Sequence, residues 1–171
     1  MRIRQERPER HTLAVIVDNE PGILARIAGL FTARGYNIES LTVSEIAAEE
    51  AVSRITIVTS ASAEVLEQIV AQLDRLVPVH KVTDLTTLGP HVERELALVK
   101  VRGRGEQRIE AMRLAEVYRG RVVDATTESF VFEVTGGSDK IDTFVALMRE
   151  VGLVEVARTG IVAIGRGKEA A

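Results

Sequence analysis

The stretch Asp18-Asn19-Glu20-Pro21-Gly22-Ile23-Leu24 (DNEPGIL) joins an apolar run to an amphipathic segment. Before it, Leu13 to Val17 is a continuous apolar run of strand length, rich in β-branched residues. After it, residues 23–34 place apolar side chains at helical spacing, and Arg34-Gly35 supply a typical helix end. Pro21 fits the first turn of this helix, because its missing N–H would have no partner there. The stretch therefore predicts a strand–loop–helix unit.

The same loop is a candidate site for a small anion. Gly22 has no Cβ, so another group can approach the backbone closely. The free N–H groups of the first helical turn and the helix dipole favour a carboxylate or a phosphate. Asn19 lies beside them and can both donate and accept hydrogen bonds. The alternative is that Asn19 or Glu20 only caps the helix, and the loop residues alone leave both interpretations open.

The elements that follow complete a recognisable order. Alternating residues predict strands over 36–46 and 52–58. A helix capped by Ser62 follows and ends before Pro78, and residues 79–85 form a further strand. The order strand, helix, strand, strand, helix, strand is the split βαβ arrangement of the ferredoxin-like fold. It predicts a four-stranded antiparallel sheet with both helices on one face.

This order occurs a second time, about 83 residues further along the chain, with Leu96 in the position of Leu13. Arg119-Gly120 matches Arg34-Gly35 as a helix end, and residues 89–91 separate the two copies. The expected elements of the second copy are a strand over 96–101, a helix over 107–118, strands over 122–126 and 129–135, a helix capped by Ser138, and a closing strand over 154–164. The fold class is therefore α+β, with two ferredoxin-like βαββαβ domains.

Composition narrows the possible functions. The 171 residues are 46% hydrophobic and 27% charged, which is typical of a soluble globular protein. The net charge of −3 argues against a nucleic-acid partner, and no apolar run approaches the roughly 20 residues of a membrane span. There is no cysteine, which suits a cytoplasmic protein and excludes a thiol nucleophile. Residues 1–11 mix basic and acidic side chains and read as a short tail rather than a signal peptide.

No catalytic or metal-binding pattern emerges from the sequence. Gly103-Arg104-Gly105 lacks the third glycine of a dinucleotide loop and the Lys-Ser/Thr pair of a Walker loop. The histidines at 11, 80 and 91 show no metal-ligand spacing. An RNA-recognition domain shares the predicted topology, but the strand over 52–58 lacks the aromatic residues that stack on bases. Nothing in the sequence resembles a catalytic constellation.

The segment HTLAVIVDNEPGILARIAGLFTARGYNIESLTV resembles the amino-terminal ACT domain of the regulatory (small) subunit of acetohydroxyacid synthase, also called acetolactate synthase. The strings VLEQI, QLDRLVPVHKV, HVEREL and EVARTGIVAIGRG extend the resemblance over roughly residues 12–166. The implied organisation is a tail over 1–11, an effector-binding and dimerising ACT domain over 12–86, a linker over 87–93, a C-terminal ferredoxin-like domain over 94–166 and a tail over 167–171.

The resemblance implies a cytoplasmic regulatory protein with no catalysis, no metal and no cofactor of its own. Its implied partner is the catalytic (large) subunit, which carries thiamine diphosphate, magnesium and FAD and condenses pyruvate into acetolactate or acetohydroxybutyrate. Members of this family raise the activity of that subunit. They also confer feedback inhibition by branched-chain amino acids in valine, leucine and isoleucine biosynthesis, with valine as the usual effector. The alternative is a stand-alone amino-acid-sensing ACT protein that acts on another partner.

The resemblance also assigns an effector site. ACT domains of this family pair side by side into a homodimer with a continuous sheet, and effectors sit at that interface. The implied effector-binding residues are Asn19, Glu20, Gly22, Ile23 and Leu24 from one chain and Asn37 and Ile38 from its neighbour. The chemistry of an amino acid agrees with this set. Helix N–H groups suit its carboxylate, oxygens near Asn19 suit its ammonium, and Leu24 with Ile38 suits a branched side chain.

Overall fold

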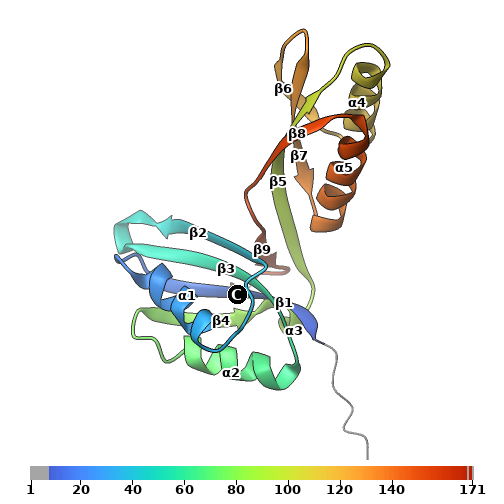
Figure 1. The fold of residues 1–171 in the computed structure, drawn as a ribbon. Helices are drawn as coiled ribbons and strands as arrows, with labels where there is room; N and C mark the ends of the chain where they lie inside the picture. Colours follow the sequence, from blue (N-terminus) through green and yellow to red (C-terminus); the bar gives the residue numbers. More distant parts are fainter. Residues whose placement is uncertain (1–7, 169, 171) are drawn as a thin grey trace, which may run out of the picture. The chain divides into compact units, whose positions relative to one another are not determined.

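The computed structural model describes residues 8–168 and 170 and divides the chain into two compact units. The first unit contains the described residues up to Val92 together with those from Ile161 onward. The second unit is Glu93–Gly160. Each unit is an antiparallel sheet with helices on one face (Figure 1).

The first unit has the predicted ferredoxin-like order. Its elements are β1 (Glu9–Asp18), α1 (Ile23–Ala33), β2 (Ser40–Ala47), η1 (Ala48–Glu50), β3 (Val52–Ala61), α2 (Ala63–Leu73), β4 (Val79–Asp84) and the short α3 (Leu85–Leu88). The strands lie in the order β2-β3-β1-β4, and each neighbouring pair is antiparallel. Because β1 is central and β2 is at an edge, the loop after β1 starts from the middle of the sheet.

The core of this unit lies between the sheet and helices α1 and α2. Side chains of a strand alternate between the two faces, so every second residue of β1 and β3 points toward the helices. The buried apolar residues of this cluster are Leu13, Val15, Val17, Ile23, Ile27, Phe31, Ile55, Ile57, Ala61, Leu66, Ile69 and Leu73. Burying one large side chain of this kind contributes about 1.5–3 kcal/mol, so the cluster holds the strand–loop–helix unit firmly.

The second unit repeats the arrangement. Its elements are β5 (His91–Arg102), α4 (Glu106–Val117), β6 (Arg121–Ala125), β7 (Ser129–Gly136), α5 (Ser138–Val151) and β8 (Leu153–Arg158). The strand order is β6-β7-β5-β8, which is the same topology as in the first unit. A separate core lies between this sheet and its two helices and contains Val99, Val101, Phe130, Phe132, Val134, Ile141, Phe144 and Met148 among others. The predicted fold, two βαββαβ units, is confirmed.

Two local predictions in the first unit are wrong. Pro21 lies in a turn and not in the first helical turn, because α1 begins only at Ile23 with Gly22 as its N-cap. Gly22 has φ +89°, a left-handed conformation that other residues adopt at a cost, and it redirects the chain into the helix. The strand expected over 36–46 begins only at Ser40. The N–H of Tyr36 donates to the Phe31 carbonyl at 2.9 Å, so the preceding residues close the helix instead.

The C-terminal stretch also differs from its prediction. The strand expected over 154–164 is two strands, β8 and β9 (Val162–Gly165). Residues 161–166, expected in the C-terminal domain, belong to the first unit. In the second unit, Gly137 is the N-cap of α5 and Ser138 makes no capping hydrogen bond. Arg119, not Gly120, adopts the positive φ (54°) at the end of α4.

Candidate functional site

The DNEPG loop is held on both flanks by backbone hydrogen bonds. The N–H of Asp18 donates to the Pro78 carbonyl at 2.8 Å, next to β4. The N–H of Asn19 donates to the Ala51 carbonyl at 2.6 Å, in the turn before β3. The N–H groups of Asp18 and Asn19 are therefore already hydrogen-bonded within the chain. The two bonds also fix the position at which the chain leaves the sheet. The loop is thus pre-organised by its neighbours and not only by its own sequence.

Two carboxylates in the loop have side-chain partners. Asp18 Oδ1 lies 2.6 Å from His80 Nε2, and Glu20 Oε1 lies 3.4 Å from Arg26 Nη1. The Arg26 guanidinium reduces the repulsion that the Glu20 carboxylate would exert on an incoming anion. Asp18 and His80 were not among the residues that the sequence indicated, and nothing in the spacing of 62 residues between them could have paired them.

The first turn of α1 offers backbone donors. Among the residues that the structure describes, no backbone carbonyl accepts a hydrogen bond from the N–H groups of Gly22, Leu24 or Ala25. The N–H of Ile23 makes only a long bond of 3.4 Å to the Glu20 carbonyl. No side chain caps the helix, so the alternative that Asn19 or Glu20 serves as a cap is not what the structure has. Unpaired donors at a helix N-terminus favour a carboxylate or a phosphate.

The side chains of the loop divide into two kinds. Ile23 is 5% exposed and belongs to the core, so only its backbone is available to a ligand. Leu24 is 41% exposed, and the side chains of Asn19 and Glu20 are exposed as well. Of the five predicted loop residues, four therefore present side chains or open backbone to solvent. Leu24 is the one that offers an apolar surface.

The second predicted segment, Asn37-Ile38, lies just before β2. The Asn37 carbonyl accepts a hydrogen bond of 2.6 Å from Thr59 Oγ1, and Ile38 packs against the edge of the first core. Beside Asn37 is a pocket of about 390 Å³, lined also by Tyr36, Thr59 and Ser60. The pocket combines residues from the β2 approach, β3 and α2, so the sequence pattern gave no sign of it.

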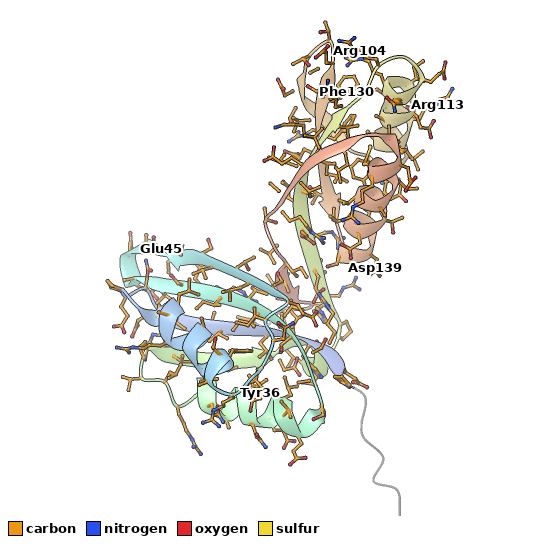
Figure 2. All side chains as sticks on the ribbon, in the orientation of Figure 1. Tyr36, Glu45, Arg104, Arg113, Phe130 and Asp139 are labelled. Atoms are coloured by element: carbon orange, nitrogen blue, oxygen red, sulfur yellow. The ribbon has the colours of Figure 1, made fainter. Side chains whose placement is uncertain are left out.

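The structure does not bring these two segments together within one chain. Asp18 pairs with Val52 at the start of β3, whereas Asn37 is held by Thr59 near the end of β3. Seven residues of strand separate Val52 from Thr59, which is about 23 Å at the usual rise per residue. Figure 2 shows the same separation, with the labelled Tyr36 and Glu45 at opposite ends of the first sheet.

The described part of the chain, 8–168 and 170, contains no group of three or more His, Asp or Glu side chains placed to hold a metal ion. Within the same residues, no helix is long and apolar enough to cross a membrane.

The β2-β3-β1-β4 sheet, its two helices and the loop with free N–H groups define the first unit as an ACT-type domain. The family model described as AHAS small subunit-like ACT domain matches residues 13–81. A second family model, small subunit of acetolactate synthase, matches residues 94–167. The chain belongs to the acetolactate synthase small-subunit family.

Similar proteins cover nearly the whole chain. It is 47% identical to a probable acetolactate synthase small subunit of Archaeoglobus fulgidus, over 94% of this chain and 99% of the relative. It is 46% identical to the acetolactate synthase isozyme 3 small subunit of Escherichia coli, over 92% and 96%. The crystal structure of an acetolactate synthase small subunit from Thermotoga maritima superposes with a TM-score of 0.85 at 38% identity, covering 94% of this chain and 99% of that one.

Proposed function

We propose that this chain is the non-catalytic regulatory subunit of a cytoplasmic acetolactate synthase. It activates the thiamine-diphosphate-dependent catalytic subunit and makes it sensitive to feedback inhibition by a branched-chain amino acid, with valine as the first candidate. Magnesium and FAD, like thiamine diphosphate, belong to the catalytic partner. The support is the family membership, together with a loop whose backbone donors suit a carboxylate.

One observation carries the proposal: the two predicted halves of the effector site lie at opposite ends of an edge strand. β2 is at the edge of the first sheet, and it runs from the Asn37 end to the Asn19 end. If β2 pairs antiparallel with the β2 of a second copy about a two-fold axis, the ends are exchanged. The Asn37-Ile38 segment of one copy then meets the DNEPG loop of the other. Two equivalent sites form, each built from both chains.

Each part of an amino acid finds a complementary group in such a site. The free N–H groups of Gly22, Leu24 and Ala25 suit the carboxylate. The side-chain and backbone oxygens of Asn19 and Glu20 suit the ammonium. The exposed part of Leu24 and the half-buried Ile38 from the other copy suit a small branched side chain. Polar ends and an apolar flank together select an aliphatic amino acid over a simple anion.

Reconstitution tests the proposed function. The chain should be mixed with a purified catalytic subunit of acetolactate synthase, and acetolactate formation from pyruvate should be measured with and without valine, leucine and isoleucine. The expected result is that the chain alone forms no acetolactate, that it raises the activity of the catalytic subunit, and that valine reverses this gain. Binding of valine to the chain with no effect on the catalytic subunit would instead support a stand-alone amino-acid sensor.

A further inference from the structure

The segment 161–166, which we call the strap, returns from the second unit and lies on the first sheet. Side chains of the edge strand β2 hold both backbone groups of its first residue. The N–H of Ile161 donates to Ser40 Oγ at 2.9 Å, and Thr42 Oγ1 donates to the Ile161 carbonyl at 3.0 Å. Ser40 and Thr42 are two residues apart on β2, so they lie on one face of the sheet.

Three further contacts fix the strap. Arg54 Nη2 on β3 donates to the Ala163 carbonyl at 2.9 Å. Burial lowers the pKa of Arg54 from its ordinary value, as expected where a guanidinium is partly removed from water. Ala163 packs with Ala14 and Leu85 in a small buried cluster. The N–H of Arg166 donates to the Pro90 carbonyl at 3.0 Å.

The alternation of burial along the strap shows which side is attached. Ile161 is 6% and Ala163 is 7% exposed, whereas Val162 and Ile164 are 55% and 63% exposed. The strap therefore contacts the sheet with only one of its sides. It lies on the face of the sheet away from α1 and α2, which also carries Ser40, Thr42 and Arg54. Four hydrogen bonds, together with the pairing of β9 with β5, hold the strap on this one side. An attachment on one side can release and re-form without disturbing the core between sheet and helices.

The strap contacts β2 next to the second half of the proposed effector site. Ser40 follows Asn37 by three residues, and β2 is the strand proposed to pair with its copy. Ile161, the strap residue that Ser40 and Thr42 hold, directly follows Gly160, the last residue of the second unit. Just before this point Arg158 ends β8, and it is anchored to Glu95 and Asp142 by ion pairs. A change in β2 thus reaches the second unit through a short, tethered piece of chain.

We propose that the strap transmits effector binding from the Asn37-Ile38 segment to the second unit, through the hydrogen bonds of Ser40 and Thr42 to Ile161. The inference rests on the proposed function, because it requires an effector at this segment. The bistable element is the strap itself, attached to β2 or released from it. An effector that orders the start of β2 shifts this equilibrium toward one state, and the second unit senses which state is populated.

The test uses the full chain reconstituted with the catalytic subunit. Thr42→Val keeps the side-chain shape and removes the donor to Ile161, and Thr42→Ser keeps the hydroxyl as the matched control. Loss of one hydrogen bond of this kind shifts the attachment equilibrium of the strap by about two- to tenfold. Thr42→Val should therefore lose most of the feedback inhibition at a saturating concentration of free valine. Its calorimetric affinity for valine should change by less than about threefold, since Thr42 is not one of the predicted effector-binding residues. Activation should persist, and Thr42→Ser should behave as the parent.

Two results would overturn the strap proposal while leaving the proposed function intact. The first is unchanged inhibition in Thr42→Val. The second is an equal loss of binding, activation and inhibition, which is what a merely structural role predicts. Hydrogen exchange of the unsubstituted complex provides a second measurement: valine should change the protection of the Ile161 amide, and unchanged protection of residues 161–166 would also contradict transmission. Absence of valine binding by the unsubstituted chain would overturn both proposals.

Discussion

At the scale of single residues, Gly22 has two properties that the candidate site needs. Its φ of +89° lies in the left-handed region that favours glycine at the start of α1, and a Cβ built on it meets no atom within 4 Å. The open space on this side is where a ligand can approach. A side chain at position 22 would therefore act on the ligand and on the backbone conformation, and hardly on packing within the chain.

Gly22→Asp should abolish feedback inhibition and preserve activation. The new carboxylate would stand beside the expected ligand carboxylate, and two such charges about 4 Å apart repel by roughly 4 kcal/mol at an effective dielectric of 20. That corresponds to nearly a thousandfold in affinity for valine, since each ~1.4 kcal/mol is a factor of ten. Gly22→Asn is the matched control, with the same shape and the same backbone strain but no charge. If calorimetry found equal affinities of the two variants for valine, the carboxylate of the ligand would not bind at this loop.

Gly152→Ala should destabilise the second unit strongly. Gly152 has φ +133°, and a Cβ there would clash with the Arg102 carbonyl oxygen, which lies beside the end of α5. Backbone strain alone costs about 1–3 kcal/mol, and the clash adds to it. Gly137→Ala is the control, because its φ is −69° and a Cβ would meet open space. Denaturant unfolding should show a loss of stability for the first variant only, and equal midpoints would contradict the local geometry.

At the scale of elements, β2 is the strand through which the proposed dimer would form. It is an edge strand, and Val43 and Ile46 on it are 45% and 54% exposed. Exposed apolar side chains on an unpaired edge favour pairing with another strand. The proposed two-fold arrangement would place residues near the middle of β2 opposite their own copies.

Val43→Lys should convert the dimer to monomers and remove valine binding. Like charges directly opposite each other in paired strands are destabilising, and an edge lysine discourages pairing. Leu98→Lys is the control, because Leu98 is 38% exposed but lies on the sheet of the second unit. Sedimentation velocity checks the prediction. A Val43→Lys chain that remains dimeric and binds valine would show that the site does not form across this edge.

The pair between β5 and β8 gives a prediction about pH. Lys100 Nζ lies 2.8 Å from Glu155 Oε2, and this hydrogen bond, followed by the charge of Lys100, lowers the pKa of the Glu155 carboxyl. The folded pKa is depressed, so the small stabilisation exists above the unfolded pKa and disappears as pH falls through the folded one. Lys100→Met should raise the pKa of Glu155 toward its ordinary value in an NMR titration. Lys81→Met in the first unit is the control and should leave the pKa of Glu155 unchanged. An equal shift of this pKa in Lys81→Met would exclude the contact with Lys100 as its cause.

The elements that the sequence predicted well are those with strong periodicity. The apolar runs of β1 and β3 and the stripes of α1, α2 and α5 match the buried faces closely, because burial of those faces determines the elements. The predicted element boundaries were wrong where backbone conformation and hydrogen bonding, and not residue type, determine where an element begins or ends. Ser138 looked like a cap from its residue type, but Gly137 occupies that position. Tyr36 looked like a strand residue, but its N–H closes α1.

At the scale of the whole molecule, the repeated pattern predicted two ferredoxin-like sheets, and the path of the chain between them was not predictable. Residues 161–166 alternate like a continuation of β8, and only contacts with β2, β3 and α3 assign them to the first unit. Two of these partners, Thr42 and Arg54, are more than 100 residues away from the strap in the sequence. A local pattern carries no information about such a pairing. For the same reason the separation of Asn37 from the DNEPG loop emerged only from the strand registers.

In the proposed dimer, each effector site is built from the loop of one copy and the Asn37-Ile38 segment of the other. Gly22→Asp damages the first half, and a bulky Asn37→Trp at an exposed position damages the second. Each variant alone should form a dimer that binds no valine. In a heterodimer of the two, purified through different affinity tags, both defects fall in the same site and the other site is intact.

Calorimetry on this heterodimer is therefore the most direct measurement. The predicted result is that one valine binds per heterodimer with the affinity of the unsubstituted protein. The enzyme reconstituted with this heterodimer should then regain about half of its feedback inhibition. The contradicting result is a heterodimer that binds no valine, because each chain would then carry a complete site of its own and each site would be damaged.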